Sequence, residues 1–263
     1  MKLSVVIPAH NEEGCIERTL TSFHEKLIEE KIPFEIVVVN DNSSDDTEKI
    51  LKRLSRKKGI RYVNNDPPNG FGFAIRKGLQ SFKGDCVAIV MADASDSPDD
   101  LVAFYRKMIE GNYDCVFGTR WSLGGRTYDY PGVKKVLNRV FNTFIQMVMQ
   151  LQYNDVTNAF KLYKKEVIQG VSPLLSPHYN LTVEIPLKAI IRGYSYVIVP
   201  NSWTNRTAGE SKLKLKEMGS RYLFIFLYCL LEKWLSCKDY HRRTEEKRAQ
   251  AIEERKQAAS TSG

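Results

Sequence analysis

The chain has 263 residues, of which 43% are hydrophobic and 27% are charged, with five cysteines and a formal net charge of +8 at pH 7. This composition excludes a disordered chain, a collagen-like repeat and a disulfide scaffold, and the length allows one large domain or two small ones. The cysteines are odd in number and widely spaced, which indicates a reducing compartment. The basic excess favours an anionic partner: nucleic acid, a phosphate-bearing substrate or an acidic membrane face.

Strand-like and helix-like patterns alternate through the first half of the chain. Predicted strands are Leu3–Pro8, Phe34–Val39, Ile60–Val63, Cys86–Met91 and Tyr113–Gly118, and predicted helices are Glu13–Glu30, Thr47–Lys58, about 70–82 and Pro98–Glu110. Asn11 is the expected N-cap of the first helix. This alternation is typical of βαβ units and predicts an α/β fold with a mostly parallel sheet flanked by helices.

Four polar clusters follow predicted strands: Pro8–Glu13, Asn40–Asp46, Asp93–Asp100 and Thr119–Gly125. Ligands of such sheets bind beyond the carboxyl ends of the strands, so these clusters are expected to converge on one site. The alternative is that the clusters are ordinary turns and helix caps.

The pattern changes from about residue 131. The second half predicts a long helix at Val133–Leu151, strands at Ala159–Tyr163 and Ser195–Val199, and a helix at Leu181–Ile191. The basic stretch Arg206–Arg221 then leads into an aromatic apolar run. No signal peptide core is evident, and the longest apolar run, Tyr222–Leu231, has ten residues where a bilayer crossing needs about 20. We therefore expect a protein that is soluble or surface-bound rather than spanning.

Several motifs occur together in a familiar order. They are Val5-Val-Ile-Pro-Ala-His-Asn-Glu12, Val37-Val-Val-Asn-Asp-Asn-Ser-Ser-Asp-Asp-Thr47, Asn69-Gly-Phe-Gly-Phe-Ala74, Gly84-Asp85, the Asp93 region, Gly118-Thr-Arg-Trp121, Asp155-Val-Thr-Asn-Ala-Phe-Lys161 and Asn205-Arg-Thr-Ala-Gly-Glu-Ser-Lys212. The chain from residue 3 to about 215 thereby resembles family 2 glycosyltransferases with the Rossmann-like GT-A fold. Within that family it most resembles the dolichol- and polyprenyl-phosphate sugar transferases, the group of the dolichol-phosphate mannose synthases.

The resemblance implies a domain organisation. Residues 1–210 would form the GT-A catalytic domain, with a nucleotide-sugar half at 1–120 and an acceptor half at 121–210. Residues 211–237 would form a basic and aromatic amphipathic helical segment. Residues 238–263 would be a charged tail, partly disordered.

The resemblance also implies contacts with a nucleotide sugar and with an acceptor phosphate. Pro8, Glu12 and Asp41 would contact the nucleoside, and Gly70 would lie in a loop on the nucleotide side. Among the residues turned toward the diphosphate or the acceptor phosphate would be Arg120, Lys134, Asn138, Arg206 and Lys212. The alternative for Lys212 and its lysine neighbours is a solvated basic face.

The segment Val90-Met-Ala-Asp-Ala-Ser-Asp carries the expected metal chemistry. A diphosphate leaving group gathers charge as it departs, and a hard cation such as Mg²⁺ or Mn²⁺ with oxygen ligands can neutralise that charge. The family's first aspartate position is Met91 here, so we interpret Asp93 as the metal ligand, with Ser95 or Asp96 completing the site. The alternative makes Asp96 only part of a helix start.

The resulting hypothesis is an inverting glycosyltransferase that moves a sugar from a nucleotide-diphosphate donor to a polyprenyl or dolichyl phosphate. Its catalytic residues would be Asp93, Arg120 and Arg206. Because a phosphomonoester with a second pKa near ~6 is largely dianionic at neutral pH, it needs no strong base. Catalysis would rest on orientation and on charge stabilisation at the departing diphosphate.

Four alternatives remain at this stage. A family 2 transferase acting on a hydroxyl would need a carboxylate base, for which Asp155 or Glu184 could be proposed. A sugar nucleotidyltransferase is less favoured because the Gly-rich activating loop of such enzymes is absent from this sequence. A non-catalytic nucleotide-binding scaffold is a further alternative because Met91 replaces an acidic residue. Nucleic-acid binding is disfavoured because no recognition helix, aromatic RNA-binding pair or zinc spacing is present.

The C-terminal part joins a basic stretch to an aromatic one that includes Trp234. This pattern is typical of a helix lying on anionic lipid, where Lys and Arg contribute ~1 kcal/mol each near the surface. We therefore expect peripheral attachment at the cytoplasmic face of a membrane, directly or through a membrane protein. The alternative is a helix packed in the core or in a homo-oligomer interface.

Overall fold

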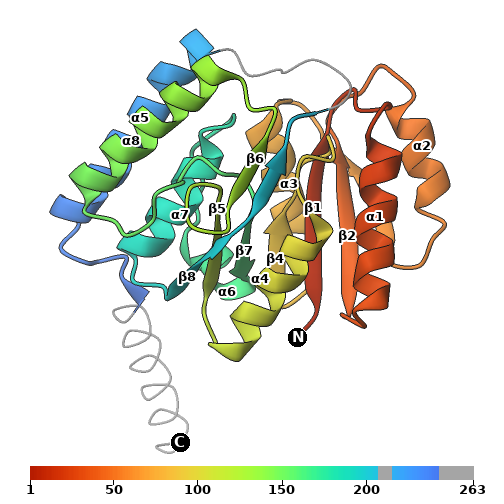
Figure 1. Ribbon diagram of the computed structural model, residues 1–263, viewed down its shortest axis with the longest axis horizontal. Helices are drawn as coiled ribbons and strands as arrows, with labels where there is room; N and C mark the ends of the chain where they lie inside the picture. The colour runs from red at the N-terminus through yellow and green to blue at the C-terminus, as the bar shows by residue number, and fades with distance from the viewer. Residues whose placement is uncertain (207–214, 243–263) are drawn as a thin grey trace, which may run out of the picture.

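A seven-stranded sheet forms the centre of the computed structural model, which describes residues 1–206 and 215–242 (Figure 1). The strands are β1 Leu3–Ala9, β2 Phe34–Asn40, β3 Ile60–Asn64, β4 Cys86–Ile89, β5 Cys115–Thr119, β7 Lys161–Lys164 and β8 Tyr196–Pro200, in the order β3-β2-β1-β4-β7-β5-β8. Only β7 runs antiparallel to its neighbours β4 and β5. The predicted mixed, mostly parallel sheet of an α/β fold is confirmed.

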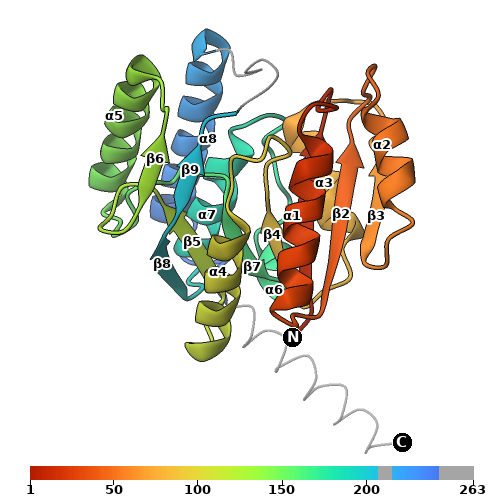
Figure 2. The same cartoon turned by 45° about the vertical axis from the view of Figure 1, so that its right-hand side comes forward.

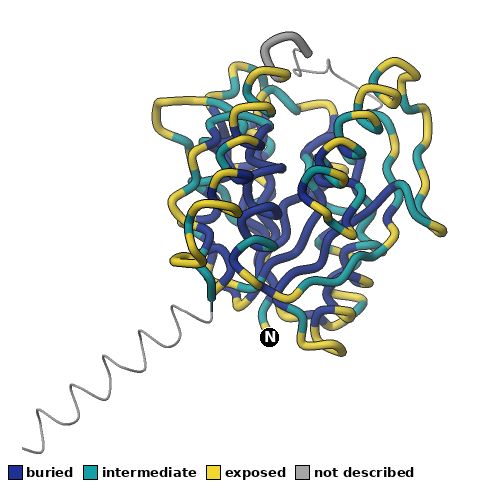
Figure 3. The backbone as a smooth tube through the Cα atoms, turned by 90° about the vertical axis from the view of Figure 1, so that its left-hand side faces the viewer, coloured by how far each residue is buried: buried dark blue, intermediate teal, exposed yellow. Residues whose placement is uncertain are grey.

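Helices cover both faces of this sheet (Figure 2). They are α1 Ile16–Glu29, α2 Thr47–Leu54, α3 Phe71–Ser81, α4 Pro98–Glu110, α5 Gly132–Met149, α6 Lys165–Gly170, α7 Leu181–Ile191 and α8 Leu215–Leu235. Helices α1, α2 and α4 share one apolar cluster with Val5 of β1, whereas α3, α5, α6, α7 and α8 share the opposite cluster with Val6. The alternation of side chains along a strand sends these two neighbours to opposite faces. Figure 3 shows the buried strands between more exposed helices.

A two-stranded parallel sheet, which the sequence analysis missed, lies beside the carboxyl end of β4. It consists of β6 Arg126–Tyr128 and β9 Ser202–Thr204. Strand β9 is fastened to the segment after β4, because the Thr204 N–H donates to the Ser95 carbonyl at 3.1 Å and Ser202 N–H donates to the Asp100 carboxylate at 2.7 Å. These bonds bring Arg206, two residues beyond β9, next to the acidic loop.

Several predicted boundaries are wrong by a few residues. The first helix begins at Ile16 after Cys15, and Asn11 does not cap it but has a left-handed φ of 53°. Its side chain instead accepts the Ser44 N–H at 2.8 Å, which ties two strand-end loops together. Helix α2 ends at Leu54. Strand β7 begins at Lys161, because Thr157, Asn158 and Ala159 before it lie in a loop that lines the cavity described below.

None of the described helices is both long enough and apolar enough to cross a bilayer. The predicted C-terminal helix is present as α8, and it lies alongside α5 in Figures 1 and 2. Two ring contacts join the helices: Phe141 with Tyr222, with centroids 5.3 Å apart, and Phe144 with Phe226 at 5.2 Å. The tail beyond 242 lies outside the described residues.

Candidate active site

A cavity of about 440 Å³ lies at the carboxyl ends of β4 and β5, under the first turns of α5 and α8. Most of the predicted acidic and phosphate-binding residues line it together: Asp93, Ser95, Asp96, Arg120, Lys134, Asn138 and Arg206. Met91, at the position of the family's first aspartate, lines it as well. Segments that are far apart in the sequence therefore converge. Two of the four polar clusters, Asp93–Asp100 and Thr119–Gly125, supply lining residues, whereas Pro8–Glu13 and Asn40–Asp46 do not. Lys212 lies outside the described residues.

The loop after β4 carries the acidic side of the cavity. Asp93 accepts the Ser95 N–H at 3.2 Å, and Asp96 accepts the Met91 N–H at 2.9 Å, so the loop folds back on itself. Ala94 between them has a left-handed φ of 58°. Burial, and then the neighbouring charge of Asp93, raise the pKa of Asp96 to about 7. A nearby cation would therefore favour the charged form of Asp96.

The donor atoms of this loop suit a hard divalent cation. Asp93 and Asp96 supply carboxylate oxygens, and the buried Ser95 hydroxyl has no hydrogen-bond partner among the described residues. Oxygen ligands of this kind select Mg²⁺ or Mn²⁺. Within residues 1–206 and 215–242 no group of three or more His, Cys, Asp and Glu side chains could hold a metal. Met91 stands where the resemblance predicts a further aspartate, and its side chain adds no carboxylate to the loop.

Arg206 places a positive charge between two loops of the sheet edge. Its Nη2 lies 2.9 Å from Asp93 Oδ2 and 3.3 Å from Glu12 Oε1. Burial by itself would lower the pKa of Arg206, but the hydrogen bond and charge of Asp93, followed by Glu12, outweigh it and raise the pKa. The guanidinium is therefore a permanent cation at the acidic end of the cavity.

Arg120 is held by a buried partner rather than extended into the cavity. Its Nε and Nη2 donate to the two carboxylate oxygens of Asp155 at 2.8 and 2.7 Å, and its backbone N–H donates to Asp155 at 3.0 Å. Burial would lower the pKa of Arg120, but the Asp155 charge reverses that effect and raises it. Arg120 thus contributes positive charge to the wall from a fixed position.

Neither carboxylate considered as a base for a hydroxyl acceptor lines the cavity. Asp155 is fully buried with both oxygens bound to Arg120. Glu184 is also fully buried; it pairs with Lys188 at 2.7 Å and accepts the N–H groups of Leu175 and Ser176, each at 2.7 Å. Both residues therefore serve the architecture beneath the site.

The residues predicted to contact the nucleoside lie at the carboxyl ends of β1, which neighbours β4, and of β2, which neighbours β1, and they do not line the cavity. Pro8 is buried in β1, and Glu12 forms an ion pair with Arg206, which lines the cavity. The Asp41 carboxylate accepts the Asn65 and Asn69 side-chain amides at 2.7 and 3.0 Å. It also accepts the Gly70 N–H at 2.9 Å. Asp41 therefore organises the loop that precedes α3.

The Gly-Phe-Gly segment has a packing role that the sequence did not reveal. A Cβ at Gly72 would lie 2.5 Å from the backbone of Pro177, and the Gly72 N–H donates to the Pro177 carbonyl at 3.1 Å. Phe71 stacks on Tyr179 with centroids 4.2 Å apart. The close approach thereby holds Tyr179 in the cavity wall.

Aromatic and apolar side chains form the part of the wall that sequence reasoning missed. They are Tyr130, Leu137, Phe141, Tyr179, Trp203 and Tyr222. No local motif distinguishes them from core residues, because they come from five separate segments. Leu137 also belongs to an exposed surface, being 49% exposed on α5. The cavity wall is therefore continuous with the outer face of that helix.

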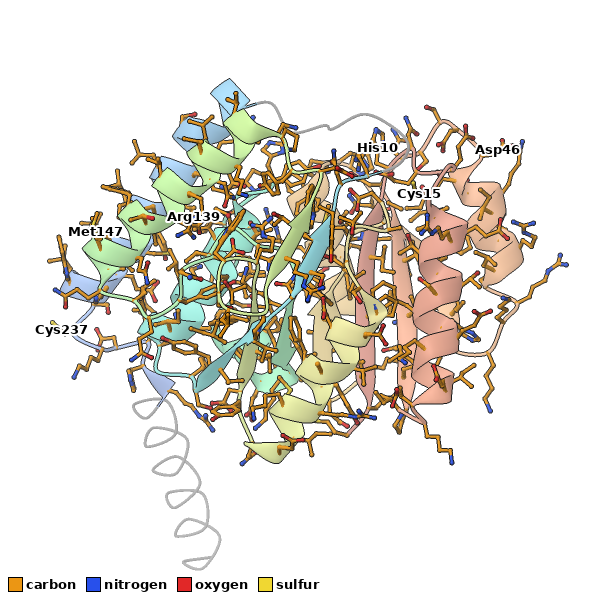
Figure 4. The ribbon with its side chains drawn as sticks, in the orientation of Figure 1. His10, Cys15, Asp46, Arg139, Met147 and Cys237 are labelled. Carbon is orange, nitrogen blue, oxygen red and sulfur yellow. The ribbon has the colours of Figure 1, made fainter. Side chains whose placement is uncertain are left out.

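We call this outer face the α5–α8 apolar surface. Large hydrophobic side chains form one stripe on each helix: Val133, Val136, Leu137, Val140, Phe144 and Met147 on α5, and Leu223, Phe224, Leu227, Leu231, Trp234 and Leu235 on α8, all more than 40% exposed. Met147 lies on the outer side of α5 in Figure 4. Their spacing of three, four and seven residues puts each stripe on one side of its helix.

Comparison with known proteins identifies relatives of this chain. The family model "Glycosyl transferase family 2" matches residues 4–171. A dolichol-phosphate mannosyltransferase of Pyrococcus furiosus is 29% identical over 82% of this chain and 60% of its own length. Glycosyltransferase AglD of Haloferax volcanii is 27% identical over 85% of this chain and 36% of its own. The chain thus spans less than two thirds of these relatives.

Solved structures show the same fold. Glucosyl-3-phosphoglycerate synthase from Mycobacterium tuberculosis, in complex with Mn²⁺, uridine diphosphate and phosphoglyceric acid, superposes with a TM-score of 0.66 over 88% of this chain and 78% of that one. The sequence identity is 19%. A second complex of that enzyme contains Mn²⁺ and uridine-diphosphate-glucose and also has a TM-score of 0.66, over 88% of this chain and 79% of that chain. The expected GT-A fold is confirmed.

Proposed function

The chain belongs to glycosyl transferase family 2, and we propose that it transfers a sugar from a nucleotide-diphosphate donor to a polyprenyl or dolichyl phosphate, with inversion at the sugar carbon. One observation carries the proposal. One cavity is lined both by the charged side chains of Asp93 and Arg206 and by Leu137 and Tyr222, and Leu137 also belongs to the α5–α8 apolar surface. A phosphate attached to an apolar chain matches that combination.

The charge distribution favours a phosphate acceptor over a hydroxyl acceptor. Among the described residues that line the cavity, the carboxylates are Asp93 and Asp96, which are assigned to the leaving group. An acceptor alcohol needs a base, whereas a phosphate dianion does not. Lys134 in the first turn of α5 lines the cavity and would bind the acceptor phosphate. Asn138, one turn later, donates to Thr157 at 2.8 Å and orders the opposite wall.

The donor side uses the acidic loop and Arg206. Asp93, Asp96 and Ser95 would hold Mg²⁺ or Mn²⁺, and that ion would neutralise the departing diphosphate. The Mn²⁺ and uridine-diphosphate-glucose bound by the structural relative support a nucleotide sugar and a divalent cation here. Arg206 adds a further positive charge, and fixed charges of this kind stabilise a transition state without reorganisation.

The α5–α8 apolar surface provides the route to a lipid acceptor. We assign it to an anionic membrane surface, because Leu137 belongs both to this surface and to the cavity lining, and because Lys134, Lys135 and Arg139 lie along the same helix in a chain of net charge +8. An amphipathic face of this kind inserts its apolar side below the lipid headgroups. The protein would thereby sit peripherally at a cytoplasmic membrane face.

A pair of charge insertions tests this membrane assignment. Val140→Glu and Phe224→Glu alter residues that are 63% and 61% exposed, and they should abolish sedimentation with anionic liposomes while leaving the melting temperature unchanged. Ile28→Glu and Ile109→Glu, on α1 and α4 and 56% and 50% exposed, are matched controls that should keep liposome binding. Equal binding by both double variants would contradict the assignment.

The function itself is tested with a panel of nucleotide sugars and three acceptors: a polyprenyl phosphate, the corresponding polyprenol and a free sugar. We expect one donor to yield a product whose mass is that of the polyprenyl phosphate plus one sugar residue, and none with polyprenol. Transfer to the polyprenol or to the free sugar, with none to the phosphate, would refute the acceptor assignment.

A further inference from the structure

Arg206 binds one oxygen of Asp93, and the backbone of the acidic loop binds the other. One Asp93 oxygen, Oδ1, accepts the Ser95 N–H, and the other, Oδ2, lies 2.9 Å from Arg206 Nη2. The same nitrogen lies 3.3 Å from Glu12 Oε1, and the side chains of Glu12 and Asp93 are each only 10% exposed. One guanidinium therefore balances two nearly buried carboxylates from the loops that follow neighbouring strands β1 and β4.

We propose that Arg206 is an internal substitute for the divalent cation: it neutralises Asp93 through their ion pair and competes with the metal for that carboxylate. The inference rests on the proposed function only in taking Asp93 as a metal ligand. It adds that the side chain which supports catalysis also suppresses metal binding until the donor arrives. Arg206 is thus a regulatory contact as well as a phosphate-binding residue.

The physical reason is repulsion between like charges. A divalent cation on Asp93 Oδ2 would lie within a few ångströms of the guanidinium, in a site where burial weakens screening by water. The two cations are compatible only if an additional anion lies between them. The donor diphosphate is that anion, since Arg206 can leave Asp93 for a phosphate oxygen while the metal takes its place.

This arrangement couples the metal to the donor. The metal alone must displace Arg206 from Asp93, whereas the metal with a diphosphate offers Arg206 a phosphate oxygen in exchange for that carboxylate. By reciprocity, the donor must tighten metal binding by the same factor as the metal tightens donor binding. An enzyme built in this way avoids holding a metal in an empty site.

Manganese binding to the full chain without nucleotide or acceptor tests the proposal. Free Mn²⁺ is titrated by electron paramagnetic resonance against the wild type and Arg206→Gln. Removing the competing cation should tighten Mn²⁺ binding by about tenfold, within the roughly 5- to 150-fold range of typical site coupling. Equal or weaker binding by Arg206→Gln would overturn the proposal, whatever its effect on sugar transfer.

The matched control is Arg53→Gln, which removes the same charge from an exposed pair with Glu17 on the outer helices. It should leave Mn²⁺ binding unchanged, so an equal gain in this control would reduce the effect to net charge and refute the proposal. Asp93→Asn combined with Arg206→Gln should lose the tightened binding. If the wild type transfers no sugar to polyprenyl phosphate, the proposed function is refuted, but the metal titrations still test the role of Arg206.

Arg206→Lys guards against misfolding of the glutamine variant. Lysine keeps the charge but lacks the planar fork, so it compensates Asp93 and Glu12 less well. We expect Mn²⁺ affinity between those of the wild type and Arg206→Gln, with a melting temperature near that of the wild type. A folded Arg206→Lys that binds Mn²⁺ as tightly as Arg206→Gln would contradict the competition, because it keeps the charge.

Discussion

Replacing Asp155 by asparagine should destabilise the protein strongly. Asp155 is fully buried, and its two oxygens accept three N–H groups of Arg120 at 2.7 to 3.0 Å. In Asp155→Asn one oxygen becomes an NH₂ group that faces a donor, and the buried Arg120 charge loses its counter-charge. Breaking one partner of a buried pair costs about 3–5 kcal/mol.

The expected change is large enough to measure by thermal unfolding. Because 1 kcal/mol shifts the melting temperature by about 2–4 °C in a domain of this size, Asp155→Asn should lower it by roughly 6–20 °C. The control is Glu48→Gln, the same acid-to-amide change in an exposed pair with Lys52 at 2.9 Å. That pair is on a helix surface and should contribute no more than about 0.5 kcal/mol.

The same measurement separates two roles for Asp155. A catalytic base can be removed with little loss of stability, whereas a structural partner of Arg120 cannot. An Asp155→Asn protein that melts within about 2 °C of the wild type, while its activity is lost, would refute the structural role and restore the hydroxyl-acceptor alternative.

Three further predictions follow from individual contacts. Asp93→Asn should reduce transfer at least about a hundredfold at saturating Mg²⁺ or Mn²⁺ with its circular dichroism unchanged, and near-normal activity would contradict its role. Burial lowers the pKa of Lys161 from 10.5 to about 7. Between these two pH values the unfolded chain binds one more proton at this lysine than the folded chain does. The unfolding free energy should therefore rise with pH there, by at most about 1.4 kcal/mol per pH unit. The unfolding free energy of the wild type, measured by denaturant titration, should therefore increase relative to that of Lys161→Met from pH 7.5 to 9.5. A constant difference would refute the lowered pKa of Lys161. Gly72→Ala should cost about 1–3 kcal/mol in denaturant unfolding because its Cβ would meet the Pro177 backbone, and an unchanged midpoint would exclude that close approach.

The strand and helix pattern was largely predictable because local hydrophobic periodicity determines it. Val5 and Val6 alternate between the two apolar clusters, as a strand buried on both faces requires. The polar clusters at strand ends predicted an edge site, and Asp93 and Arg120 from two of the four clusters do line one cavity. The roles assigned to Pro8, Asp41 and Gly70 at the nucleoside remain predictions.

The tertiary structure decided which charges are available for chemistry. From the sequence, Arg120 was predicted to be catalytic and Asp155 or Glu184 could be proposed as a base for a hydroxyl acceptor, because pairing between distant segments leaves no local pattern. Folding joins Arg120 to Asp155 across 35 residues and buries Glu184 against Lys188, whereas Arg206 meets Asp93 across 113 residues. The helices α5 and α8, each with an apolar stripe, come side by side only when the chain folds. Sequence alone determined the fold class and the edge of the sheet where the site lies, since both follow from local periodicity; the state of each charge depended on contacts that only the folded chain brings about.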